Sequence, residues 1–163
     1  MANTQSMCTS FMSELMYGYH QFGQPTLTSR GSLTSPTNDT FKGALYLASA
    51  TINASTTAYT VTGEVSGTGY SAGGVTVTNA TPPTYTNSSS TAGVAYWTPS
   101  ASLTYTTVTL TTAFDTVLIY NSTQGNRAVS VHTFGSQTIT AGTFTLTMPS
   151  NTTTTALLRL ATT

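Results

Sequence analysis

The side chains that could carry acid–base chemistry are few in this chain. Its four carboxylates, Glu14, Asp39, Glu64 and Asp115, are spread along 163 residues. A glycosidase needs two carboxylates that face each other across a substrate, and only Glu64 with Asp115 could meet that requirement in the fold predicted below. Each carboxylate is also explained as a solvated or capping group, and we favour that interpretation.

A second pattern could supply a nucleophile. Residues 69–73 form a G-x-S-x-G motif around Ser71, and Ser71, Asp115 and His132 follow one another in the order of an α/β-hydrolase triad. That motif needs a strand-to-helix turn, whereas residues 75–78 predict a strand. The glycines of the same loop also lack the following helix and lysine of a phosphate-binding loop. We therefore interpret the loop as a turn and expect no enzyme.

Metal or redox chemistry would depend on Cys8, His20 and His132. A zinc site needs three or four ligands, and no spacing signature joins these three. Cys8 is the single cysteine, so it has no partner for a disulfide within the chain, and we expect a buried thiol. No metal and no cofactor are predicted.

Scarcity of charge is the strongest compositional feature. Four basic and four acidic residues give a net charge of zero, and 5% of the chain is charged, whereas soluble domains average about 25%. Nucleic acid and membrane surfaces are not expected as partners, because the basic residues form no stripe. No secretion signal or membrane-spanning segment is recognisable, which favours folding in the cytoplasm. A surface with so little charge must carry hydroxyl and amide groups or be covered by partners.

Residues 9–22 predict the one helix. Phe11, Leu15, Tyr19 and Phe22 recur at three- to four-residue steps and form an apolar stripe. Hydroxyl residues at positions 9 and 10 could cap its start. The stripe could dock on the chain's own sheet or on a neighbouring subunit, and the sequence leaves both open. A polar connector, interpreted as an extended arm, completes an N-terminal region of residues 1–38.

From residue 40 the hydrophobic period changes to two. Threonine supplies about a quarter of the chain, and as a β-branched residue it suits strands better than helices. Short alternating segments are separated by loops rich in Gly, Pro, Asn and Ser, a spacing typical of sandwiches and jelly rolls. We predict an all-β fold: an antiparallel, jelly-roll-like β-sandwich of about eight strands over residues 39–163. The expected strands are 40–48, 57–65, 75–77, 93–98, 103–112, 114–120, 128–134, 142–148 and 156–160.

Several segments resemble a widespread family of virion proteins of tailed bacteriophages. These are DTFKGALY (39–46), EVSGTGYSAGG (64–74), VLIYNS (117–122) and NRAV (126–129), with GTFTLTMP (142–149) and LLRL (157–160) near the end. The resemblance covers most of residues 10–161. It implies a virion structural protein, similar in some members to the cement or decoration proteins that bind capsids as small β-sandwich oligomers. The implied partners are the major capsid protein and further copies of the chain, as a homotrimer on the capsid surface after synthesis in the host bacterium.

Two alternatives remain open. One is a tail, neck or fibre-associated virion protein, and the other is a β-sandwich that binds host glycans through aromatic platforms. Strand alternation places only one of Tyr96 and Trp97 in the core, and Trp97 is the better candidate. The side chains expected to bind partners are Phe11, Leu15, Tyr19, Phe22, Tyr70, Tyr96 and Trp97.

Overall fold

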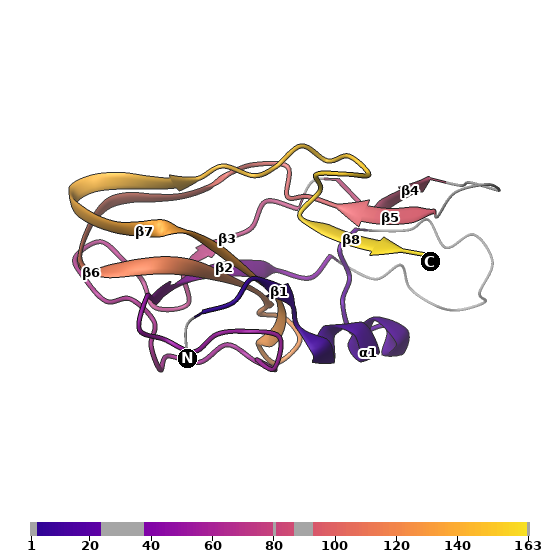
Figure 1. Ribbon diagram of the computed structural model, residues 1–163, viewed down its shortest axis with the longest axis horizontal. Coiled ribbons are helices and arrows are strands. Elements are labelled where there is room, and N and C mark those ends of the chain that lie inside the picture. Colours follow the sequence, from indigo (N-terminus) through magenta and orange to yellow (C-terminus); the bar gives the residue numbers. More distant parts are fainter. Residues whose placement is uncertain (1–2, 24–37, 80, 87–92, 163) are drawn as a thin grey trace.

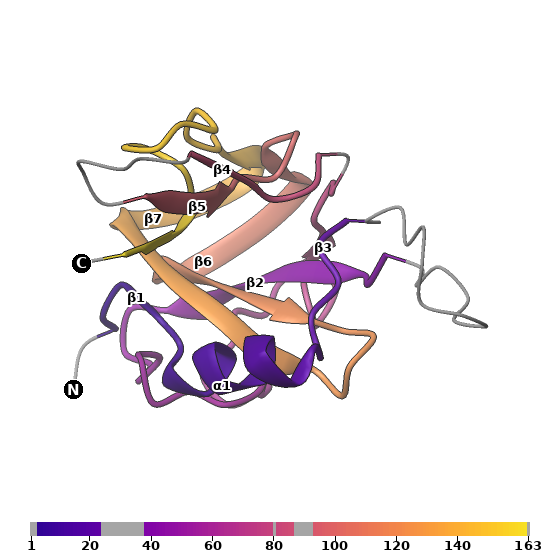
Figure 2. The same ribbon diagram turned by 90° about the vertical axis from the view of Figure 1, so that its right-hand side faces the viewer.

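The fold consists of two antiparallel sheets and one short helix (Figures 1 and 2). The computed structural model describes residues 3–23, 38–79, 81–86 and 93–162. The five-stranded sheet has the order β1-β7-β6-β2-β3, and the three-stranded sheet has the order β4-β5-β8. The elements are β1 (Ser6–Met7), α1 (Thr9–Tyr17), β2 (Phe41–Leu47), β3 (Val75–Thr76), β4 (Thr84–Thr86), β5 (Val94–Trp97), β6 (Leu103–Asn121), β7 (Arg127–Leu146) and β8 (Leu158–Ala161).

This arrangement confirms the predicted antiparallel, sandwich-like fold with about eight strands and a short N-terminal helix. The two sheets are open rather than closed into a barrel. The extended arm predicted before residue 39 lies outside the described residues, except for Asn38.

The long hairpin of β6 and β7 connects the two layers. The strands pair along their whole length, from Leu103 opposite Leu146 to Asn121 opposite Arg127. The register shifts repeatedly along the hairpin, and such bulges bend a strand and increase its twist. The hairpin therefore curves round one end of the molecule, so that its two halves lie in different layers (Figure 1). The sequence predicts two separate strands in each of these stretches, which is wrong because bulges rather than turns interrupt the alternation.

The core lies between the layers. Val117, Leu118 and Ile119 are consecutive in β6, and each is 0% exposed. Both faces of the strand are therefore covered, as the continuous apolar run predicts. Phe41 and Leu45 of β2 are equally buried beside them.

Helix α1 is shorter than predicted. It ends at Tyr17 because Gly18 adopts a left-handed φ of 74°. The N–H groups of Gly18 and Tyr19 then donate to the carbonyls of Leu15 and Glu14, which is the Schellman arrangement. The residue that precedes the helix is Cys8, which makes no side-chain cap, so the predicted hydroxyl cap is wrong.

The strand predicted at residues 57–65 is also wrong. This segment makes only isolated bridges, at Ala58 and at Glu64. Gly63 has a φ of 79° and turns the chain back, so that the Tyr59 hydroxyl donates a hydrogen bond to the Glu64 carboxylate (2.6 Å). The two-residue β1 and three-residue β4 are too short to give a recognisable alternation.

Candidate interaction surface

The side chain of Glu64 is buried and hydrogen-bonded within the protein, so it does not face an open cleft. It is 9% exposed and accepts hydrogen bonds from the hydroxyls of Tyr59 (2.6 Å) and Tyr70 (2.8 Å) and from the N–H of Gly73 (2.7 Å). Burial, reinforced by hydrogen bonding to Glu64, raises the pKa of both tyrosines, so they remain protonated donors. The Glu64 carboxylate therefore links the glycine-rich loop, residues 66–74, to the turn that precedes it.

The glycine-rich loop lies directly against the main sheet. Gly69 and Gly74 have left-handed φ values of 79° and 70°. A Cβ atom on either residue would collide with a main-chain carbonyl, that of Thr107 in β6 or Gly43 in β2. These glycines are required for a close approach of backbones, which agrees with the interpretation of the loop as turn structure.

The other residues considered for catalysis, Ser71, Asp115 and His132, make no side-chain hydrogen bond to one another. Asp115 accepts a hydrogen bond from the Asn3 amide (2.8 Å), whereas His132 pairs with the Ser130 hydroxyl (2.8 Å). Ser71 is exposed on the glycine-rich loop. The contacts of the described residues therefore assemble neither the hydrolase-like triad nor the pair of Glu64 with Asp115.

Cys8 and His20, which the sequence offers as potential metal ligands, are also engaged within the fold. Cys8 is fully buried, and burial, with a smaller effect of Glu14, raises its pKa to about 12. His20 is bonded to Glu14 (2.7 Å). Within the described part of the chain, no three His, Cys, Asp or Glu side chains are grouped so that they could hold a metal ion. No helix among these residues is long and apolar enough to cross a bilayer.

On one side of α1, five polar residues form what we call the polar cluster: Glu14, His20, Asp39, Asn121 and Arg127. Glu14 is 5% exposed. One of its oxygens contacts His20 Nε2 (2.7 Å), and the other accepts a hydrogen bond from Arg127 Nη1 (2.8 Å). The guanidinium of Arg127 also lies over the Tyr19 ring, 4.4 Å from its centroid.

The hydrogen bonds of Asn121 define the protonation of His20. Asn121 Oδ1 accepts from the main-chain N–H groups of residues 123 and 124, so its Nδ2 is the atom that faces the cluster. Nδ2 donates to His20 Nδ1 (3.1 Å) and to Asp39 Oδ2 (2.7 Å). His20 is therefore neutral, with its proton on Nε2 and directed at Glu14. Burial, the largest influence, lowers the pKa of His20 and favours this neutral form.

The polar cluster fastens the helix to its own chain. It joins α1 to the end of β6, the start of β7 and the residue that precedes β2 by two positions. Phe11, on the same helix, is 2% exposed in the core. The question that the sequence leaves open is thus answered for the helix: it docks on the sheet of its own chain.

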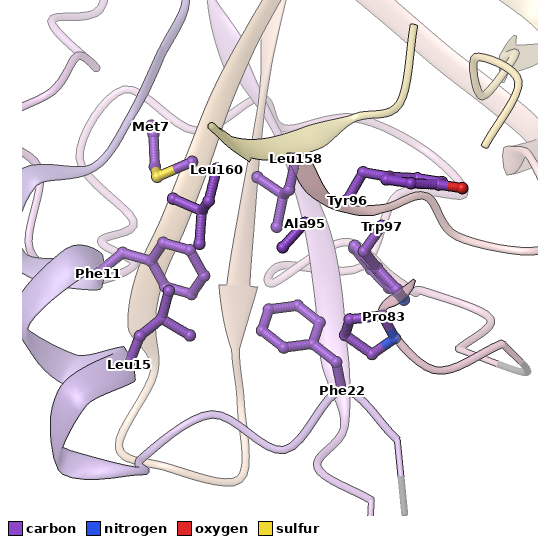
Figure 3. Close-up of a pocket in the computed structure, with 10 residues that line it drawn as sticks. All are labelled: Met7, Phe11, Leu15, Phe22, Pro83, Ala95, Tyr96, Trp97, Leu158 and Leu160. Atoms are coloured by element: carbon purple, nitrogen blue, oxygen red, sulfur yellow. The ribbon is translucent and has the colours of Figure 1, made fainter. Parts of the chain in front are cut away.

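On the other side of α1, between the helix and the three-stranded sheet, lies an apolar groove of about 100 Å³ (Figure 3). Phe11 and Leu15 point into it from the helix, and Leu158 and Leu160 point into it from β8. The lining has no charged side chain. The residues that line the apolar groove are Met7, Phe11, Leu15, Phe22, Pro83, Ala95, Tyr96, Trp97, Leu158 and Leu160.

Five of the seven predicted partner-binding residues meet at this groove: Phe11, Leu15, Phe22, Tyr96 and Trp97. The other two lie elsewhere. Tyr19, 41% exposed, covers Arg127, and Tyr70 binds Glu64 in the glycine-rich loop.

Trp97 forms the inner end of the groove. It is 2% exposed and packs edge-on against Phe22, with ring centroids 4.8 Å apart. Its indole N–H lies 3.0 Å from both Asn79 Oδ1 and the carbonyl of Thr81. The ring of Tyr96 points away from the groove (Figure 3), which confirms that alternation places Trp97 rather than Tyr96 in the core.

The rim of the groove is exposed. Leu160 is 43% exposed on β8, and Tyr85 on β4 is 67% exposed. Tyr85 and Leu160 share one face of the small sheet, because both are paired with Ala95. On the helix, Met12 and Met16 are 49% and 85% exposed but do not line the groove. The Leu157-Leu-Arg-Leu160 pattern could have indicated the part that β8 contributes, whereas nothing in the sequence indicates Met7.

Comparison of the chain with protein-family models, with curated proteins and with solved structures gives no match.

Proposed function

We propose that this protein is a non-enzymatic structural protein of a phage virion, and specifically a capsid cement or decoration protein that binds and stabilises the major capsid protein shell. The observation that carries this proposal is the apolar groove with its exposed rim. Apolar surface that remains open beside a well-packed core is characteristic of protein–protein contact sites.

The chemistry of the groove supports a protein partner over a small ligand. Small-molecule sites combine apolar walls with a few convergent polar groups. Here the Trp97 N–H is already directed at Asn79 and Thr81, and Tyr96 points outward (Figure 3). The same facts give little support to a glycan-binding module, because Trp97 has no exposed ring face for a sugar to stack on.

The resemblance to tailed-phage virion proteins supports the same proposal, and it adds a homotrimer at three-fold positions of the shell. Measurement of copy number per particle tests it directly. Hundreds of copies on the outside of the head are expected for a decoration protein, whereas six or twelve copies at the portal or tail would favour the tail, neck or fibre alternative.

The low charge of the chain leads to a further expectation about binding. Because the groove lining contains no charged side chain, attachment to the particle should depend on apolar burial and should be nearly unchanged between about 0.05 and 1 M salt. Release of the protein can be followed by sedimentation of particles at each salt concentration. Steep release below about 0.2 M would show that attachment is electrostatic and that the groove is not the contact.

A further inference from the structure

Strand β8 has an open edge. It is the last strand of the order β4-β5-β8, and it pairs with β5. The N–H of Thr162 donates to the carbonyl of Gly93 at the end of β5 (2.9 Å). Main-chain groups alternate in direction along an antiparallel strand, so those of Arg159 and Ala161 point away from β5, toward the open edge.

Space for another segment exists beside this edge. A recess of about 240 Å³ is bounded by β8, β1 and the residues of β7 near Val131. Met7 and Leu158 line both this recess and the apolar groove. The two hollows therefore adjoin, and a chain that pairs with β8 would lie next to the groove.

The charge beside the edge indicates the chemistry of the partner. Arg159 lies on the face of β8 opposite to Leu158 and Leu160, is exposed, and donates to the carbonyl of Thr153 (3.2 Å). Neither of the ion pairs found among the described residues involves it. An incoming strand that carries a carboxylate next to this guanidinium would complete a charge pair.

A second copy of the chain is poorly suited to supply that carboxylate. Glu14, Asp39 and Glu64 are each at most 9% exposed, and Asp115 is bonded to Asn3. The four carboxylates are thus committed within their own chain. This distribution of side-chain carboxylates favours a different protein as the source of the complementary group.

We propose that β8 accepts an extended segment of a different protein as an added strand, with alternate apolar side chains directed into the apolar groove and an acidic side chain beside Arg159. Strand addition gives affinity through main-chain hydrogen bonds and specificity through alternate side chains. The inference builds on the proposed function, in which that protein is the major capsid protein, and it names the kind of segment that is bound.

The experiment uses the full-length protein and a displayed library of random nine-residue peptides. Selection should enrich peptides with apolar residues at alternate positions and Asp or Glu between them. The affinity of a selected peptide is then measured through the fluorescence of Trp97, which lines the groove and is the single tryptophan. NMR shifts should be concentrated in β8 and β1.

Two variants test the mechanism. Ala161→Pro removes an outward N–H and leaves the pairing of β8 with β5 in place, so it should weaken peptide binding about tenfold, whereas Ala161→Ser keeps the N–H and should bind like the wild type. Arg159→Glu should weaken an acidic peptide about two- to fivefold and strengthen the same peptide with Lys in place of the acid. The second variant remains informative if the proline variant folds poorly.

The outcomes separate the two proposals. Failure to enrich an alternating pattern, equal binding by Ala161→Pro and Ala161→Ser, or shifts confined to other strands would each overturn the strand site. Self-association through β8, seen as dimers that Ala161→Pro abolishes, would overturn the assignment to a different protein. If peptides bind as expected but the protein is absent from phage particles, the strand site stands and the virion role is wrong.

Discussion

The two sides of helix α1 differ in chemistry. On one side, Glu14 makes two short contacts in the polar cluster, to His20 and Arg127. On the other side, Leu15 faces the uncharged apolar groove. The same short helix is therefore fastened by buried polar contacts and exposes apolar surface beside them.

This difference separates stability from recognition. Three of the eight charged residues, Glu14, Asp39 and Arg127, lie in the polar cluster, where loss of one partner leaves other buried groups unpaired. At the rim of the groove, by contrast, the side chains of Tyr85 and Leu160 are exposed. Substitutions in the polar cluster should therefore lower stability more than binding, and substitutions at the groove rim should lower binding more than stability.

The largest effect is expected in the polar cluster. Glu14→Ala should lower the free energy of unfolding by about 3 kcal/mol, because it leaves the His20 N–H without an acceptor in a buried site and removes the partner of Arg127. Urea denaturation of the single and double variants with Arg127→Ala measures this in a double-mutant cycle. Additive losses would show that the Glu14–Arg127 contact contributes little and that the two sides of the helix are more alike than proposed.

A smaller loss of stability is expected when the pH is lowered, because burial favours the neutral form of two histidines. Burial lowers the pKa of His20 below its ordinary value of 6.5, and it lowers the pKa of His132 to about 4. Below pH 6.5 the unfolded chain therefore binds protons that the folded chain excludes, so stability falls as the pH falls from 6.5 toward 4. A loss of about 2 kcal/mol between pH 7 and pH 5 is expected from His132 alone.

Denaturation midpoints at pH 7 and pH 5 test this expectation. The double variant His20→Gln with His132→Gln should show a flatter profile than the wild type. The groove lining lacks acidic, basic and histidine side chains, so affinity for the particle should change little over the same range. A parallel loss of binding and stability would instead indicate that the groove opens when the polar cluster is protonated.

The smallest effect on stability is expected at the groove rim. Tyr85→Thr and Leu160→Thr should change the free energy of unfolding by about 1 kcal/mol or less, because the two side chains are 67% and 43% exposed. They should nevertheless weaken attachment to the particle. Val61→Thr is the matched control, since Val61 is 68% exposed on another part of the surface, and it should alter neither property.

The fold class was accessible from the sequence, and so was much of the groove. Period-two alternation identifies β2, β5 and β8 and places Trp97 inside. The apolar stripe of the N-terminal region identifies Phe11, Leu15 and Phe22, although Gly18 ends the helix before Phe22. These features are local, so a pattern of neighbouring residues is sufficient to reveal them.

The remaining features depend on contacts between distant residues. Glu14 and Arg127 are 113 positions apart, and no local pattern relates them. The bends in β6 and β7 follow from packing of the hairpin over the core, with left-handed conformations at Thr107 and Ala141 that local propensity disfavours. The open edge of β8 is a property of sheet order, which alternation alone does not determine.

The β6–β7 hairpin also has a consequence for synthesis on the ribosome. Strand β2 ends at Leu47 and pairs with β6, which in turn pairs with β7 as far as Leu146. At about 5–20 residues per second, roughly 5–20 s separate the emergence of these two ends. For roughly 4–15 s of that interval, until β6 is complete at Asn121, the apolar residues of β2 lack their main partner strand. The nascent chain should therefore need a chaperone, or a low local concentration, until its C-terminal third is made.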